Sequence, residues 1–98
     1  MPDDYVEEYP QSGERIRGKQ TARTVNDNYP GGLPNMVDLS FEVNGNLGVL
    51  ELLVEYDGNQ VHICEIVELQ DGKIKSARAY FSVPFEAAQW RVQWVERT

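Results

Sequence analysis

The chain has 98 residues, of which 16 are acidic and 9 are basic, and its net charge is −7 at pH 7. This length suits a single domain spanning residues 1–98 with one modest core. The negative charge argues against nucleic acid and anionic membranes as partners, and no apolar run approaches the ~18 residues that a membrane-crossing helix needs.

The N-terminal part of the chain predicts one short strand and one helix. Polar and apolar residues alternate from Asp4 to Tyr9, which indicates a short edge strand that Pro10 ends. From Gly18 to Tyr29, apolar side chains recur at positions i, i+3 and i+7, which indicates a helix. The sequence Pro30-Gly31-Gly32 ends this helix.

The central part of the chain predicts an antiparallel meander of four strands. Alternation and β-rich composition mark strands at about 36–43, 47–56, 61–69 and 73–82. Three short turns separate them, at Asn44-Gly45-Asn46, Asp57-Gly58-Asn59 and Asp71-Gly72. Two of the strands are apolar on both faces, so we expect helices, sheet curvature or a partner subunit to cover the sheet.

The tail from Pro84 to Val95 is open to two interpretations. Pro84 suits a first helical turn, and the low strand propensity of Ala87-Ala88-Gln89 also favours a helix. Against this, apolar side chains alternate at Trp90, Val92 and Trp94, as they would along a strand. We predict a helix.

Three stretches carry, in this order, a resemblance to a known family: Asp4–Lys19, Asp71–Ile74 and Tyr80–Glu86. They resemble the SnoaL-like branch of the NTF2-like superfamily, and the resemblance covers nearly the whole chain. It implies an α+β fold in which a curved antiparallel sheet, the four-strand meander plus the short edge strand, packs on helices as a cone around a pocket. Members include polyketide cyclases, steroid isomerases, epoxide hydrolases, dehydratases and proteins that only bind or dimerise, so the fold alone does not fix the reaction.

Two departures from the family pattern shape the functional prediction. Members usually carry a long N-terminal helix that closes the cone, and this sequence shows none before the segment 3–10. Either another subunit covers the gap, or the pocket is wide open, or the domain is a shortened one. We expect a homodimer, because self-association is the simplest way to cover the exposed apolar area. Members also often place acids in the last strand and just before the Pro-Phe pair, where this chain has Ala77, Ala79 and Val83. None of these three side chains can transfer a proton.

Acid–base candidates remain elsewhere on the predicted sheet. His62 is the single histidine, a residue type that exchanges protons near neutral pH, and it shares a strand face with Cys64. Apolar residues flank Glu65 on its own face, so burial would raise the pKa of its carboxyl group. Glu7 or Asp4 matches the early strand that supplies the catalytic carboxylate in steroid isomerase relatives. The alternative for each of these residues is an ordinary place at a solvated surface or a dimer seam.

Aromatic side chains are candidates for lining an apolar pocket. The set that we expect to contact a small apolar ligand is Tyr5, Tyr9, Tyr56, Tyr80 and Trp90, although aromatic residues are also common in cores and interfaces. One histidine and one cysteine make no metal-ligand cluster, and no Gly-rich loop suits a phosphate, so we expect neither metal nor cofactor. A lone cysteine and an acidic start unlike a targeting peptide favour a cytoplasmic location.

Two functional classes remain open. The lack of acids at Ala77, Ala79 and Val83, together with the missing helix, favours a small-molecule-binding or assembly module on the cone that does not catalyse. The alternative is a cofactor-independent isomerase, cyclase, dehydratase or hydrolase that acts by proton transfer on a small apolar substrate. It would use His62, Glu65 or Glu7 as the acid or base and a tyrosine as hydrogen-bond donor.

Overall fold

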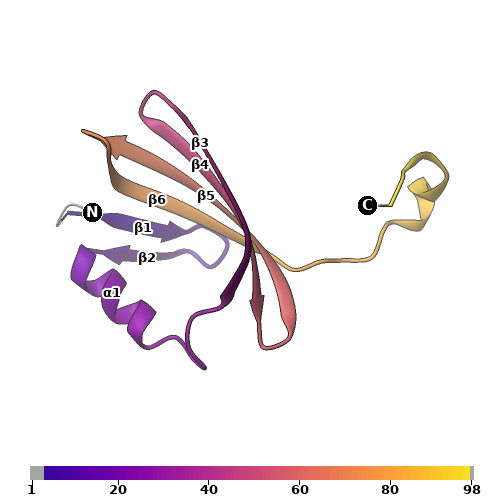
Figure 1. Cartoon of the computed structure of the whole chain (residues 1–98), viewed down its shortest axis with the longest axis horizontal. Coiled ribbons are helices and arrows are strands. Elements are labelled where there is room, and N and C mark those ends of the chain that lie inside the picture. Colours follow the sequence, from indigo (N-terminus) through magenta and orange to yellow (C-terminus); the bar gives the residue numbers. More distant parts are fainter. Residues whose placement is uncertain (1–3, 98) are drawn as a thin grey trace.

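The computed structural model describes residues 4–97 and shows one twisted, curved sheet with a single α-helix against it (Figure 1). The six strands run in the order β2-β1-β6-β5-β4-β3 across the sheet. They are β1 (Val6–Tyr9), β2 (Glu14–Arg17), β3 (Asn35–Asn44), β4 (Leu47–Tyr56), β5 (Asn59–Gln70) and β6 (Lys73–Ser82). The helix α1 spans Lys19–Asp27, and a 3-10 helix, η1, spans Gln89–Trp94. The acidic start before Asp4 lies outside the described residues.

The predicted meander is confirmed, because β3, β4, β5 and β6 pair antiparallel in chain order. Its tight turns explain why the strand bounds could be predicted. Asp57 and Gly58 have φ angles of 52° and 78°, and Asp71 and Gly72 have 54° and 77°. Two consecutive positive φ angles are the geometry of a type I′ hairpin turn, which Asp-Gly adopts at low cost.

The segment 4–9 forms a strand, yet this strand lies inside the sheet rather than at its edge. Glu14–Arg17, which the sequence pattern did not predict as a strand, adds β2 on the outer side of β1. On its other side β1 pairs parallel to β6. The side-chain amide of Gln11 prolongs this pairing, since its Nε2 donates to the Phe81 carbonyl at 2.8 Å and its Oε1 accepts from the Phe81 N–H at 2.6 Å.

The helix predicted from Pro84 to Val95 is wrong for about half of its length, and the rest forms a 3-10 helix rather than an α-helix. Residues 83–88 have no regular structure, and only η1 is helical. A helix this short gains stability mainly from packing an apolar face, and Figure 1 shows that this tail projects away from the sheet instead. The local helical preference of Ala87-Ala88-Gln89 therefore had no packing to support it.

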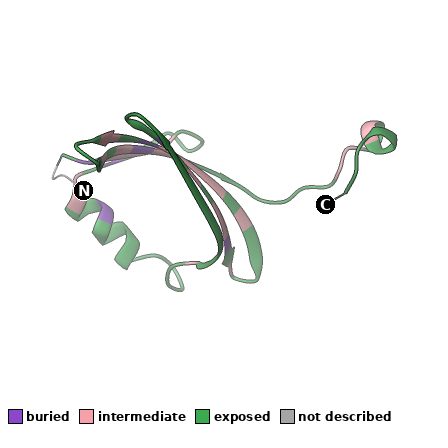
Figure 2. Cartoon of the chain, turned by 45° about the horizontal axis from the view of Figure 1, so that its top comes forward, coloured by how far each residue is buried: buried purple, intermediate pink, exposed green. Residues whose placement is uncertain are grey.

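The core lies on the concave side of the sheet, where α1 packs across β1, β2 and their neighbours. The predicted helix over 18–29 is confirmed as α1, and its Ala22 joins a buried cluster with Tyr5, Ile16, Val67 and Ala77. Figure 2 shows that buried residues concentrate on this side of the sheet and that β3 is exposed along its length. The buried core therefore lies toward the β2 end of the sheet and does not extend to β3 at the opposite end.

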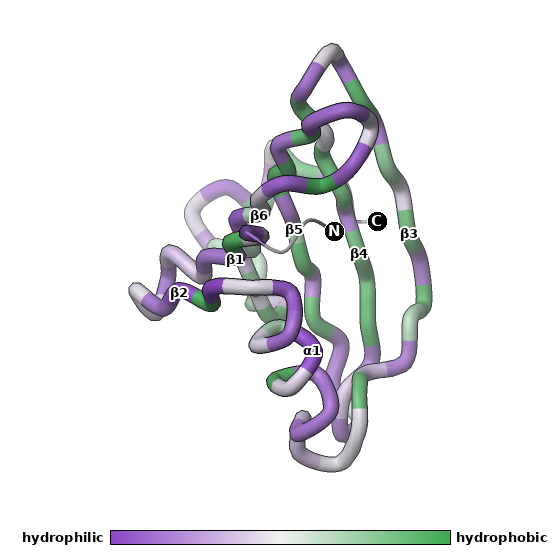
Figure 3. Tube along the Cα trace, turned by 90° about the vertical axis from the view of Figure 1, so that its left-hand side faces the viewer, coloured by the Kyte–Doolittle hydropathy of each residue, from purple (hydrophilic) through white to green (hydrophobic). Residues whose placement is uncertain are grey.

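The concave face over β3 and β4 stays open. Leu39, Phe41 and Val43 of β3 are 49%, 49% and 52% exposed. In Figure 3 α1 lies toward the β2 end of the sheet, and apolar stretches of β3 and β4 at the opposite end remain uncovered. Gly48 marks where this open part meets the core: a Cβ there would lie 2.8 Å from Val67 Cγ2 and 2.9 Å from Phe41 Cε1, so glycine lets the two side chains approach.

Candidate functional site

Two glutamates lie on the concave face, on either side of β6. In the strand register Glu7 of β1 is paired with Ala77 of β6, and Glu65 of β5 is paired with Ala79 of β6. Residues two apart on a strand point to the same face, so both carboxylate side chains rise from the same side of the sheet. Their strands are two strand spacings apart, about 10 Å.

The alanines between them make room for these carboxylates. Ala77 and Ala79 are 3% and 1% exposed, so their methyl groups are covered by neighbouring side chains. A larger residue at either position would displace the side chains that pack over β6 between the two glutamates. The lack of acids in β6 therefore does not leave this face without carboxylates, because the neighbouring strands supply them.

Two tyrosines hold Glu7. The Tyr5 hydroxyl donates to Glu7 Oε1 at 3.0 Å, and the Tyr9 hydroxyl donates to Glu7 Oε2 at 2.6 Å. Burial raises the pKa of both tyrosine hydroxyls, and the nearby Glu7 carboxylate raises it further. Both hydroxyls therefore stay protonated as donors, and each oxygen of Glu7 has a fixed partner.

Glu65 has a different environment from Glu7. Its side chain is half-buried, and on its own strand face it lies between the half-buried Ile63 and the buried Val67. Burial raises the pKa of the Glu65 carboxyl group, and the charge of Glu7 raises it further. Two carboxylates whose surroundings differ in this way can take different roles in proton transfer.

His62 lies on the opposite, convex face. Strand alternation places it, with Cys64 and Tyr80, on the side facing away from Glu65. His62 is exposed, and these residues line a shallow hollow of about 170 Å³ together with Glu51. The structure thus separates His62 from the glutamate pair.

The remaining aromatic candidates lie far from the pair. The Tyr56 hydroxyl donates to the Pro30 carbonyl, and its ring meets Tyr29 edge-on at 5.4 Å, so Tyr56 anchors the loop that follows α1. Trp90 lies in η1 and is 74% exposed. Of the residues named from the sequence, the structure brings together Tyr5, Glu7, Tyr9 and Glu65.

Sequence reasoning missed what shapes this site. Phe81 follows Ala77 and Ala79 on the concave face of β6, and its ring meets Tyr9 edge-on at 5.5 Å. Next to this contact lies an open hollow of about 380 Å³ lined by Tyr9, Gln11, Ser12, Glu14 and Phe81. The alternation of alanines in β6 was the available signal, because small residues in a strand mark where another group approaches.

Two general findings complete the description of the site. Among residues 4–97, no group of three or more histidine, cysteine, aspartate or glutamate side chains is arranged to hold a metal ion. Within the same described range, no helix is both long enough and apolar enough to span a membrane.

Comparisons with known proteins place the chain in a family. No protein-family model and no curated protein matches the sequence. Among solved structures, an NTF-2 like protein of unknown function from Burkholderia xenovorans LB400 is 37% identical, with a TM-score of 0.89 over 99% of this chain and 76% of that one. A protein proposed to be a ketosteroid isomerase, from Kribbella flavida DSM 17836, is 19% identical, with a TM-score of 0.85 over 100% of this chain and 72% of its own.

A third structure agrees with these two in fold. An LEH-like epoxide hydrolase of M. tuberculosis is 25% identical, with a TM-score of 0.59 over 84% of this chain and 65% of its own. The named activities differ among these neighbours, so what they share with this chain is the fold. The identity and coverage of the Burkholderia protein show that the chain belongs to the NTF2-like family.

Proposed function

We propose that the concave face binds a small apolar molecule and that Glu65 and Glu7 transfer a proton on it without a cofactor. One observation carries this proposal: a half-buried carboxyl with a raised pKa lies on the same apolar face as a carboxylate that two tyrosines hold. Buried titratable groups in this arrangement are commonest at functional sites. Within the family, we assign the chain to the SnoaL-like branch.

The proposed chemistry uses the two glutamates in separate roles. The Glu7 carboxylate, oriented by Tyr5 and Tyr9, takes a proton from a carbon next to a substrate carbonyl. The C–H electron pair forms a C=C bond while the π pair of the C=O bond moves onto the carbonyl oxygen. Glu65, whose raised pKa favours its protonated form, donates a hydrogen bond to that oxygen as its negative charge develops. Glu7 then returns the proton to the same or another carbon, so the step is neutral overall and needs no oxidant, reductant or metal.

The fold neighbours are consistent with this class of reaction. One is proposed to be a ketosteroid isomerase and another is an LEH-like epoxide hydrolase. Of the four reaction types that the sequence left open, isomerisation of an enolisable ketone needs the fewest groups beyond the two glutamates.

Deuterium exchange tests the proposal across a whole class of substrates at once. The protein is incubated in D₂O with a panel of enolisable ketones, from cyclohexanone to a β,γ-unsaturated steroid ketone, and proton NMR follows loss of the α-proton. We expect exchange with at least one ketone, slowed ~100-fold or more in E65Q and in E7Q. The control H62N changes the convex face and should exchange at the wild-type rate. No exchange with any member of the panel would contradict proton transfer on ketones.

A second candidate function, a non-catalytic binding or assembly module, has its own supporting observation. The concave face over β3 and β4 is open, with apolar side chains about half-exposed. Ligand-observed NMR on the same panel distinguishes the two functions, because a module binds without exchange. In either case, the lone Cys64, which forms no disulfide, supports our proposal that the protein is cytoplasmic.

A further inference from the structure

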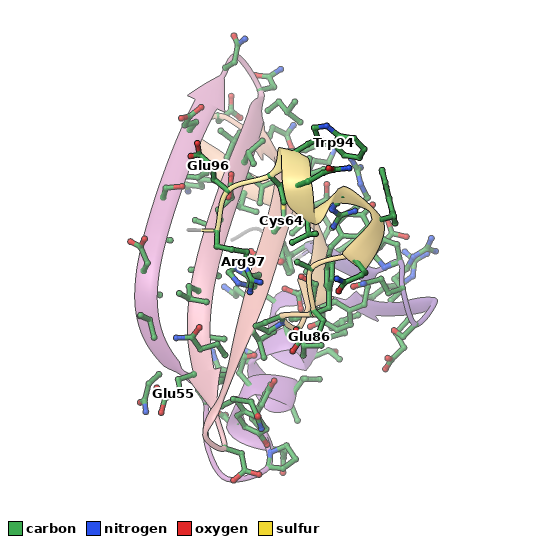
Figure 4. The ribbon with its side chains drawn as sticks, turned by 90° about the vertical axis from the view of Figure 1, so that its right-hand side faces the viewer. Glu55, Cys64, Glu86, Trp94, Glu96 and Arg97 are labelled. Atoms are coloured by element: carbon green, nitrogen blue, oxygen red, sulfur yellow. The ribbon has the colours of Figure 1, made fainter. Side chains whose placement is uncertain are left out.

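Residues 83–97, here called the tail, are unusually apolar for a segment that leaves the fold. Phe85, Trp90 and Trp94 are 82%, 74% and 71% exposed. Within residues 4–97, neither α1 nor any strand packs substantially against η1. Figure 1 shows the tail standing clear of the sheet, and Figure 4 views it end-on with Trp94 and Arg97 marked. Aromatic residues exposed on an arm of this kind are typical of segments that dock on a protein surface.

The same chain has a surface of matching chemistry. The open part of the concave face, formed by Leu39, Phe41 and Val43 of β3 beside Leu50 and Leu52 of β4, is apolar and is not covered by α1. Exposed apolar area of this extent marks an interaction surface. The tail and this open face are therefore two complementary apolar surfaces in one molecule.

Charge favours the tail as the part that approaches a second copy. The tail carries Arg91 and Arg97 against Glu86 and Glu96, so its side chains are neutral and the whole net charge of −7 lies before it. The convex face, in contrast, has five exposed acids: Asp38, Glu42, Glu51, Glu55 and Glu68. Two convex faces would repel each other, whereas a neutral tail meets no such barrier.

Geometry and area favour exchange between two copies. The residue before η1, Ala88, is extended, with φ −65° and ψ 132°, and the tail leads away from its own sheet. At about 150 Å² for each of the three aromatic side chains, two tails and the surfaces that receive them would bury on the order of 1,800 Å² in total. That area is within the range of stable protein interfaces, and a single tail on a single face would bury about half of it.

We propose that the tail of one copy docks on the open part of the concave face of a second copy, and that the second copy reciprocates, which gives a tail-exchanged homodimer. The homodimer expected from the uncovered sheet thus acquires a specific interface. This interface does not depend on proton transfer by Glu65, and the two proposals are tested by separate measurements.

Sedimentation of the full chain is the first test. We expect the wild type to sediment at about twice 11.2 kDa at high micromolar concentration. The double variant W90S/W94S should associate ~100-fold or more weakly, because aromatic anchors carry most of the binding energy. The control V49S changes an apolar residue on the convex face and should remain dimeric. A wild type that sediments near 11.2 kDa, or a W90S/W94S variant that dimerises normally, would overturn the proposal.

A mixing experiment tests the exchange itself. The variant L39S/V43S alters the receiving face at two exposed positions and leaves Phe41 against Gly48, and circular dichroism confirms that it folds. Alone, it should be monomeric. Mixed with W90S/W94S, it should form a mixed dimer that is weaker than the wild-type dimer but stronger than either variant alone, because one intact tail then meets one intact face. Failure of the mixture to associate at any attainable concentration would contradict the exchange.

Tryptophan emission reports where the tail lies, because both tryptophans of the chain, Trp90 and Trp94, are in it. We expect a blue-shifted emission maximum in the dimer and a red shift on dilution into monomer. An emission maximum that stays blue in the monomer would place the tail on its own concave face and would overturn the exchange.

Discussion

Glu65 and Glu7 lie on one face of the sheet, separated by β6, and two tyrosine hydroxyls hold Glu7. Their surroundings are therefore unequal although their chemistry is the same. Burial and the charge of Glu7 raise the pKa of the Glu65 carboxyl group, which favours its protonated form relative to an ordinary glutamate.

Glu65 should make the protein less stable as the pH rises. The pKa of its carboxyl is raised in the folded state above the ordinary value of 4.5, so the folded protein binds this proton more tightly than the unfolded chain does. The stability that this bound proton contributes is complete below the ordinary pKa of 4.5, and it is lost as the pH rises through the raised pKa of the folded state. The free energy of unfolding of E65Q should therefore exceed that of wild type at pH 7, and the two should differ little near pH 4. Urea denaturation at both pH values measures this, and equal differences at the two would contradict it.

The tyrosines should produce a second pH effect at high pH. Burial and Glu7 raise the pKa of Tyr5 above 10.0, so its contribution to stability is present below pH 10 and is lost as the pH rises further. We expect Y5F to lose less stability than wild type between pH 9 and pH 11. The control Y80F alters an exposed tyrosine on the convex face and should lose as much as wild type in the same denaturation series.

The space over β6 should tolerate only small side chains. Ala79 is 1% exposed, so leucine there must displace its neighbours, and we expect A79L to destabilise the fold by about 1–3 kcal/mol. The same substitution should push Glu65 away from the face and lower its pKa. A79S, which adds a single atom, should retain nearly all the stability. Thermal unfolding measures the first effect, and an A79L protein as stable as A79S would contradict the packing argument.

The side chain of Gln11 should stabilise the junction of β1 and β6. It makes two hydrogen bonds to the backbone of Phe81, and each such bond contributes about 0.5–1.5 kcal/mol. We expect Q11A to lower the free energy of unfolding by about 1–3 kcal/mol. Gln60 is an exposed glutamine at the start of β5, and Q60A should change stability much less. Equal effects of the two substitutions would count against the extended pairing.

The meander was predictable because its signals are local. Alternation places Glu65 between Ile63 and Val67 on one face, and each Asp-Gly pair specifies a tight turn from two residues alone. The short strand β2 was missed because Ile16 is the single apolar residue among its four. A segment this short gives too little pattern to distinguish a strand from a loop.

The site was only partly predictable because its geometry is non-local. Glu7 and Glu65 were both named, but their proximity depends on the parallel pairing of β1 with β6, which joins segments far apart in the chain. Strand alternation alone puts His62 and Glu65 on opposite faces of β5, but the sequence could not show that Glu7 lies on the Glu65 side. The helix prediction for the tail failed for the opposite reason. The tail has a local preference for helix, but it does not pack against the rest of its own chain, so nothing stabilises a longer helix.

The titration of Glu65 tests the central claim most directly. Carbon-13 NMR of the side-chain carboxyl groups would follow Glu65 in wild type, in E7Q and in the control E55Q, which changes an exposed carboxylate on the convex face. We predict that the pKa of Glu65 lies above its ordinary value in wild type and E55Q, and falls in E7Q because the neighbouring charge is gone. An ordinary pKa for Glu65 in wild type, or one that E7Q leaves unchanged, would contradict the paired site.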